Sequence, residues 1–145
     1  MGGGRVIVLD THIWVWWING DPALPRGCYG YLDGLRVGEI GVSVFSCWEV
    51  AMLHGRGRLD FGRPLDEWLS LALGRAGVVP LELSAEIAVD SCRLPGEFHG
   101  DPADRIIIAT ARAHSCPLVT VDSKMLAYPH AHVVHPRSLA VKSGG

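Results

Sequence analysis

The chain has 145 residues, of which 48% are hydrophobic and 19% charged, a composition typical of one globular domain and not of a disordered segment. Its net charge of −2 excludes the global basic field of many nucleic-acid-binding proteins, so any polyanion has to be held locally. Since no apolar run reaches the roughly 18 residues of a membrane span and no signal-peptide pattern precedes the first apolar run, we expect a cytoplasmic protein without a membrane segment.

The first half of the chain predicts two buried strands, each followed by a helix. Residues 5–9 and 39–44 are short apolar, β-branched runs of the kind that form parallel strands. Residues 13–18 predict a short helix with Ile13, Trp14 and Trp17 on its core side. Residues 46–53 predict another helix, which ends near Gly55. Between them, residues 23–38 include five glycines or prolines and have only a weak helical pattern.

The second half repeats this alternation. Helices are predicted over residues 64–73 and 84–92, and from Asp101-Pro102 to Ala111, where Asp is a good cap and Pro fits the first turn. Strands are predicted over residues 78–81, 117–121 and 133–134. Because strands alternate with helices and hairpin signals are absent, we expect an α/β fold in which a parallel sheet is covered by helices on both faces. Residues 1–145 contain no linker and predict one domain.

Five acidic residues fall where this fold would gather them. Asp10 follows the first strand, Glu49 lies in the helix after the second, and Asp122 follows the fourth. Asp101 and Asp104 open the helix that leads into the fourth strand. Ligands of parallel sheets bind beyond the carboxyl ends of the strands, so we expect these carboxylates near one edge.

Each acid also has a purely structural explanation. Asp10, Asp101 and Asp122 can be helix caps, Ser46-x-x-Glu49 matches a capping box, and Asp104 suits the first turn of a helix. Their joint placement favours a site, because carboxylates that share a site repel one another unless a cation compensates. Oxygen-only ligation suits Mg²⁺ or Mn²⁺, which activate water and support phosphodiester hydrolysis.

The segments that carry these acids resemble the PIN domain and, more narrowly, the VapC-type toxins of bacterial toxin–antitoxin pairs. The motifs are Val8-Leu9-Asp10-Thr11-His12, residues 46–51, residues 94–95 with 99–111, and residues 118–122. The likeness extends over residues 5–134. It implies a three-layer α/β/α sandwich and a Mg²⁺- or Mn²⁺-dependent endoribonuclease that leaves a 5′-phosphate and a 3′-hydroxyl.

The resemblance also implies roles for single residues. The four acids of the family correspond to Asp10, Glu49, Asp104 and Asp122, which would be the catalytic residues and would hold one or two ions. Asp101 belongs to an Asp-Pro-x-Asp-Arg variant and would bind metal through water. Further expected contacts to RNA, water or the acids come from Arg105, Thr11 and Thr120. The family further implies a homodimer, silenced by a small cognate VapB-like antitoxin that blocks the acidic pocket.

Other interpretations of single features stay open at this stage. Arg105 either holds a phosphate oxygen or pairs with a nearby acid. The stretch with Arg56, Arg58 and Arg63 is either a solvated loop or a contact to the RNA backbone. His99 either contacts RNA or the antitoxin, or makes a hydrogen bond within its loop.

Other functions are less well supported by the residue patterns. His130-x-His132 suggests a transition-metal site, but no third ligand stands at a standard spacing. A dehalogenase-type phosphatase needs an acid at His12, and a response-regulator receiver needs one after residues 79–81. The alternative from another class is a catalytically silent PIN-like module that binds RNA or protein.

Overall fold

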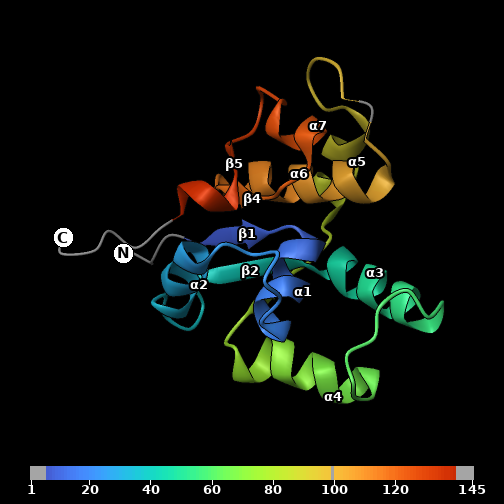
Figure 1. Cartoon of the computed structure of the whole chain (residues 1–145). Helices are drawn as coiled ribbons and strands as arrows, with labels where there is room; N and C mark the ends of the chain where they lie inside the picture. Colours follow the sequence, from blue (N-terminus) through green and yellow to red (C-terminus); the bar gives the residue numbers. More distant parts are fainter. Residues whose placement is uncertain (1–5, 99, 140–145) are drawn as a thin grey trace.

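The centre of the computed structural model is a parallel sheet. The structure describes residues 6–98 and 100–139, with the backbone alone at residue 75. Five strands lie in the order β3-β2-β1-β4-β5 (Figure 1). They are β1 (Ile7–Leu9), β2 (Ile40–Ser43), β3 (Val79–Leu81), β4 (Leu118–Val119) and β5 (Val133–Val134). All neighbouring strands are parallel, as predicted. The predicted first strand began at Arg5, which lies outside the described residues.

Helices cover both faces of this sheet. Figure 1 shows α5, α6 and α7 above the strands, α1, α2 and α4 below them, and α3 leaving the end of β2. The helices are α1 (Thr11–Asn19), α2 (Arg26–Asp33), α3 (Val44–Gly55), α4 (Leu65–Leu69), α5 (Ala85–Cys92), α6 (Pro102–His114) and α7 (Ser123–Leu126). The predicted three-layer α/β/α sandwich is therefore confirmed.

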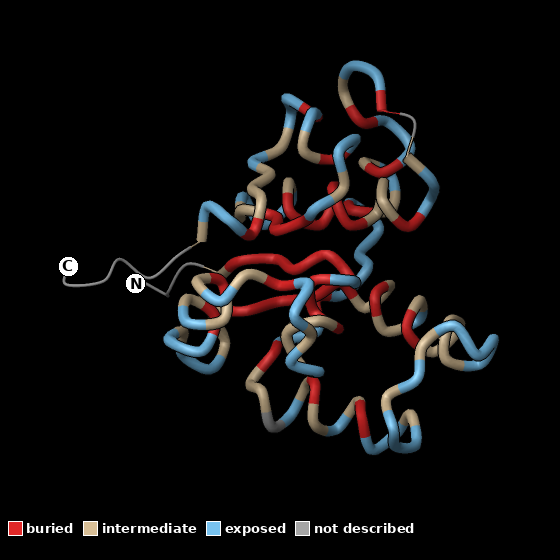
Figure 2. The backbone as a smooth tube through the Cα atoms, viewed as in Figure 1, coloured by how far each residue is buried: buried red, intermediate tan, exposed pale blue. Residues whose placement is uncertain are grey.

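Alternation along β1 divides the hydrophobic core into two halves. Ile7 and Leu9 pack in the half that includes α1, α2 and α4, whereas Val8 packs in the half beneath α5 and α6. Figure 2 shows the central strands buried over their length. Because both faces are covered, the strand has to be apolar at every position, which is why its sequence is an uninterrupted hydrophobic run.

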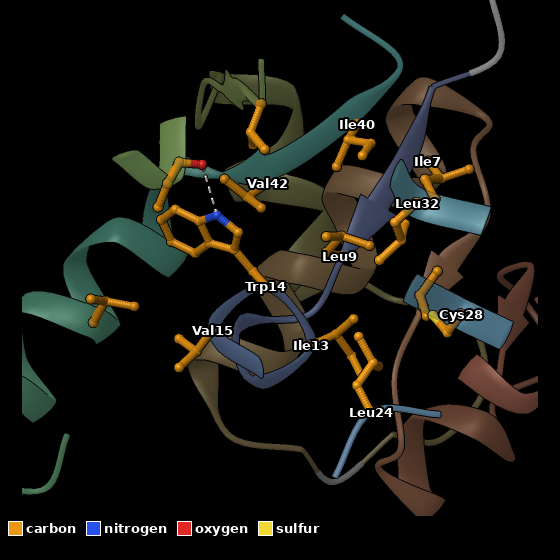
Figure 3. Close-up of a cluster of buried hydrophobic side chains, with 14 of the residues drawn as sticks. Ile7, Leu9, Ile13, Trp14, Val15, Leu24, Cys28, Leu32, Ile40 and Val42 are labelled. Carbon is orange, nitrogen blue, oxygen red and sulfur yellow. Dashed lines mark hydrogen bonds between the residues drawn. The ribbon is translucent and has the colours of Figure 1, made fainter. Parts of the chain in front are cut away.

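Helix α1 is fixed by its tryptophans. Trp14 is fully buried, packs at a 5.1 Å centroid distance against Trp68, and donates from Nε1 to the carbonyl of Ala72 at 3.2 Å (Figure 3). Trp17 is partly buried and donates from Nε1 to Asp33 Oδ1 at 2.9 Å, which ties α1 to α2. Ile13 and Trp14 are buried as predicted, and Trp17 packs against the core while also making this polar contact.

Several boundaries differ from the sequence-based expectations. The glycine-rich segment 23–38 contains a regular helix, α2, whose Cys28 and Leu32 are buried in the core. The helix predicted over 64–73 is the short α4 followed by a π-helical turn, η1 (Ser70–Arg75). A second short turn, η2 (Pro136–Ser138), follows β5. None of the helices within residues 6–98 and 100–139 is both long and apolar enough to cross a membrane.

The strand order positions the acidic segments. The chain moves from β1 outward to β2 and β3, then crosses back to β4 on the other side of β1. This reversal creates a switch point between the carboxyl ends of β1 and β4, the usual ligand site of such sheets. Asp10 follows β1 directly, and Asp122 follows β4 after two further residues.

Candidate active site

Asp10 is a buried carboxylate at the switch point. Its Oδ1 accepts the backbone N–H of Thr11 at 2.8 Å, which caps α1, and its Oδ2 accepts the Thr120 hydroxyl at 2.6 Å. Burial raises the pKa of Asp10, and the charge of Asp122 adds to the rise. The two hydrogen bonds and His12 lower this pKa in part. Asp10 is therefore both a helix cap and an acid oriented from two sides.

Glu49 comes from α3, and the structure excludes the alternative explanation of Glu49 as part of a capping box with Ser46. The helix begins two residues before Ser46, and its cap is Ser43, whose Oγ accepts the N–H of Phe45 at 3.0 Å. The Glu49 carboxylate instead accepts the Thr11 hydroxyl at 2.6 Å. Burial raises the pKa of Glu49, and the charges of Asp10 and Asp101 raise it further. The hydrogen bond from Thr11 and the nearby His12 lower this pKa in part. Glu49 is thus free of a capping role and lies beside the other acids.

Asp101 and Asp104 open α6 as predicted. Asp101 Oδ1 accepts the N–H of Asp104 at 3.0 Å, and Pro102 occupies the first turn. Burial raises the pKa of Asp104 to about 7, and the charges of the other acids add to the effect. The acids that raise this pKa are, in order of effect, Asp101, Asp10, Asp122 and Glu49. Asp104 therefore lies within electrostatic reach of all four.

Asp122 completes the group from the end of β4. Its Oδ1 accepts the N–H of Met125 at 2.9 Å and caps α7, and its own N–H donates to Thr120 Oγ1 at 3.0 Å. Thr120, which is fully buried, thereby joins Asp122 to Asp10. The Thr120 hydroxyl therefore connects Asp10 and Asp122, because it donates to the first and accepts the backbone N–H of the second.

No basic side chain neutralises this acidic cluster within the described residues. The ion pair found there is Arg112 with Asp90 at 3.0 Å, on α6 and α5 and apart from the cluster. Five carboxylates without a paired cation repel one another and favour binding of a positive ion. In the described parts of the chain, no three His, Cys, Asp or Glu side chains already stand in a metal-binding arrangement.

Comparison with known proteins decides the family. A family model described as the PIN domain matches residues 7–131. This chain belongs to the PIN domain family. The PIN domain is 30% identical over 128 residues to "Ribonuclease VapC22" of Mycobacterium tuberculosis (strain ATCC 25618 / H37Rv), a match that covers 88% of this chain and 95% of the relative.

Solved structures share the fold of this PIN domain. A toxin-antitoxin complex from Klebsiella pneumoniae matches with a TM-score of 0.64 at 22% identity, covering 90% of this chain and 97% of that chain. VapBC2 from Rickettsia felis, bound to a DNA fragment from its promoter, matches with a TM-score of 0.65 at 20% identity, covering 90% and 98%. FitAcB from Neisseria gonorrhoeae has a TM-score of 0.65 at 19% identity, covering 92% and 100%. At these identities the likeness shows the fold.

Arg105 of the PIN domain forms no ion pair with an acid in the described residues, and its expected contact to a phosphate oxygen stays a prediction. Its Nε donates to the carbonyl of Ser91 at 2.8 Å, and its Nη1 donates to the carbonyl of Phe98. These bonds tie the last turn of α5 and the loop that follows it to the start of α6. The guanidinium therefore supports the segment that carries Asp101 and Asp104 and does not neutralise an acid.

The structure also adds one residue to the site that the sequence had assigned elsewhere. Ser46 is fully buried, and its Oγ lies 2.8 Å from the Thr11 hydroxyl, which itself donates to Glu49. Since Ser46 and Glu49 are three residues apart on one helix, they share a face, and this spacing is the signal that could have revealed the contact.

The histidines that the sequence analysis considered do not form a metal site in the described residues. His130 and His132 are exposed and belong to no metal-binding group in the described residues. His130 instead accepts Arg112 through its carbonyl. His99, which precedes the acidic helix, lies outside the described residues. His12 is exposed and close enough to lower the pKa of Asp10 and of Glu49.

Proposed function

We propose that this PIN domain is a Mg²⁺- or Mn²⁺-dependent endoribonuclease that acts as the toxin of a toxin–antitoxin pair. The observation that carries the proposal is the acidic cluster at the switch point. Its carboxylates come from four separate segments of the chain, the charges of the other four raise the pKa of Asp104, and none of them has a paired cation in the described residues. The likeness to a protein named as a VapC ribonuclease supports the same activity.

The donor set fits a hard divalent cation. Every candidate ligand is a carboxylate oxygen, which suits Mg²⁺ or Mn²⁺ and not a thiolate- or imidazole-seeking metal. Asp10, Glu49, Asp104 and Asp122 would hold the ion, with Asp101 at the rim as a contact through water. When bound, such an ion supplies charge stabilisation at the phosphate and a water of lowered pKa.

The side chains of the protein itself prepare the site for an RNA phosphodiester. The Thr120 hydroxyl holds Asp10, and the Thr11 hydroxyl holds Glu49, so that both carboxylates keep a fixed orientation. Burial of Asp10 and half-burial of Glu49 and Asp104 remove competing water from the reacting centre. These residues position charge for hydrolysis, in which a water oxygen displaces a ribose oxygen at phosphorus.

The partners follow from the same site. A group of unpaired carboxylates is blocked most directly by a cation-bearing segment of another protein, which is how we propose that a cognate VapB-like antitoxin silences the enzyme. Solved structures with this fold include toxin–antitoxin complexes, which supports an antitoxin partner. We also propose a homodimer, to be measured by light scattering of the purified chain.

Cleavage of a labelled RNA in Mg²⁺ and in EDTA tests the activity. We expect products with Mg²⁺ or Mn²⁺ and none with EDTA. Asp104→Asn should reduce cleavage by at least a hundredfold, on the order of the effect of losing an electrostatic group from an active site, and should leave the fold intact. Val89→Ala, an exposed change on α5, is the matched control. Equal metal-dependent cleavage by Asp104→Asn would contradict the role of Asp104 in the site, whereas RNA binding by the unmodified chain without any cleavage would support the silent binding module instead.

A further inference from the structure

Helix α3 carries an aromatic pair beside the acids that the cluster does not use. We define the aromatic pair as Phe45 and Trp48, whose rings lie 5.0 Å apart between centroids at an interplanar angle of 36°. Trp48 is 56% exposed, and Phe45 is half-buried. Burying an aromatic ring would release about 1.5–3 kcal/mol, so a large exposed ring beside the site requires an explanation.

The geometry of the helix places this pair next to the site. Consecutive residues of an α-helix are rotated by about 100°, so Phe45 lies about 40° around the axis from Glu49, and Trp48 lies about 60° further in the same direction. Around the helix axis, Phe45 therefore lies between the positions of Glu49 and Trp48, while along the axis it lies about 6 Å to the N-terminal side of Glu49. An RNA strand held at the acids could meet both rings on this side of α3.

The far end of α3 leads into a basic loop. We define the arginine loop by Arg56, Arg58 and Arg63, all exposed, in the segment that joins α3 to α4. None of the three forms an ion pair in the part of the chain that the structure describes. Arg56 follows Glu49 by seven residues, a rise of about 10 Å along the helix. At this distance, the arginine side chains can contact phosphates of an RNA strand that is bound at the acidic cluster.

We propose that the aromatic pair is a base-stacking platform and the arginine loop a phosphate contact for single-stranded RNA; this rests on the proposed ribonuclease function. An aromatic ring stacks on any unpaired base, and arginines neutralise the backbone. Trp48 is the one large apolar side chain of α3 that is more than a third exposed. Two rings on a helix whose far end leads into exposed arginines suit an unpaired base and its backbone, whereas a protein helix would require a continuous apolar stripe.

Binding of a fluorescein-labelled single-stranded RNA dodecamer tests the proposal. The full-length chain with Asp104→Asn, in Mg²⁺, prevents cleavage during an anisotropy titration. Adding Trp48→Ala should weaken binding about five- to a hundredfold, whereas Trp48→Phe should retain most of the affinity. The loss should vanish for a duplex of the same sequence, whose bases are already stacked. Val89→Ala on α5 is the matched control and should bind as the parent does.

The arginine loop has its own signature. Arg56→Gln with Arg58→Gln should lower the slope of log affinity against log salt by about 0.7 per arginine. Trp48→Ala should leave that slope unchanged, and Arg93→Gln, exposed after α5, should leave both slope and affinity unchanged.

Several outcomes separate this inference from the proposed function. Unchanged RNA affinity in Trp48→Ala, while the unmodified chain still cleaves RNA in Mg²⁺, overturns the platform and spares the function. Loss of binding to a partner protein without loss of RNA affinity also overturns it. Dependence of RNA affinity on Trp48 in a chain that never cleaves RNA supports the platform and overturns the function.

Discussion

At the scale of single residues, two threonines set the geometry of the acidic cluster. Thr120 donates to Asp10 at 2.6 Å and accepts the N–H of Asp122 at 3.0 Å, so its hydroxyl is used in both directions. Thr11 donates to Glu49 at 2.6 Å and contacts Ser46. Hydrogen bonds to a carboxylate are stronger than those between neutral groups. The acids are therefore held by neutral hydroxyls, which leave their negative charge available to a cation.

Replacing Thr120 with valine removes this connection while keeping the side-chain shape. Asp10 loses a donor and the N–H of Asp122 loses its acceptor, so we expect a loss of about 1–3 kcal/mol in the free energy of unfolding. Cleavage should fall at least tenfold. Thr120→Ser keeps the hydroxyl and should retain most of the stability and most of the cleavage activity. Thermal melts and cleavage rates measure the two effects, and full activity in the valine variant would contradict a positioning role.

Arg105 provides a second prediction at this scale. Because its guanidinium bonds the carbonyls of Ser91 and Phe98, Arg105→Gln should lower the free energy of unfolding by about 1.5–3 kcal/mol. Arg105→Lys should be destabilising too, since an ammonium cannot span both carbonyls. Urea unfolding measures this loss. The salt slope of RNA binding should stay unchanged; a drop of about 0.7 would instead reveal a phosphate contact.

At the scale of the elements, the starting residue of α3 decides what Glu49 can do. A helix beginning at Ser46 would use Glu49 for backbone capping, whereas a helix capped by Ser43 leaves it for the site. Only Ser46 was considered as a cap from the sequence, whereas the structure uses Ser43, the last residue of β2. Ser43 pairs with Leu81 of β3 and so belongs to the sheet as well as to the cap.

This assignment can be tested with a pair of variants. Ser43→Ala should lower the free energy of unfolding by about 1 kcal/mol through loss of the cap. It should also speed hydrogen exchange at the N–H of Phe45, the group that Ser43 accepts. Ser46→Ala should leave that exchange unchanged, because the Ser46 hydroxyl contacts Thr11. Faster exchange at Phe45 in Ser46→Ala alone would restore the capping box.

At the scale of the whole molecule, the sequence was sufficient to predict the three α/β/α layers. It also predicted that the residues after β1 and β4 lie at one edge of the sheet. Apolar runs and intervening helices predict a parallel sheet, and residues after such strands share an edge, so Asp10 and Asp122 needed no tertiary information. The partners of Arg105 could not be predicted, because they are backbone carbonyls of α5 and of the following loop, and their positions depend on how these segments pack against α6. The helix within residues 23–38 was also underestimated, since burial of Cys28 and Leu32 outweighs the local cost of glycine.

Burial of the acidic residues, together with the repulsion between their charges, makes the stability of the metal-free protein depend on pH. The pKa of Asp104 is about 7 in the folded chain against an ordinary 3.8, so the folded state binds an extra proton between these values. Stability in EDTA should therefore fall as pH rises from about 4 to about 7. The raised pKa values of Asp10 and Glu49 act in the same direction.

Melting temperatures between pH 4.5 and 8 with and without Mg²⁺ measure this dependence. Asp104→Asn should flatten part of the slope in EDTA and raise the melting temperature at pH 7.5, because it removes a repelled charge. Mg²⁺ should stabilise the unmodified chain most at high pH, where the ligands are ionised and no proton has to leave. Val89→Ala should follow the unmodified chain at every pH. A melting temperature in EDTA that rises steadily toward pH 7 would contradict a shared acidic cluster, since paired carboxylates stabilise a fold as they ionise whereas crowded ones destabilise it.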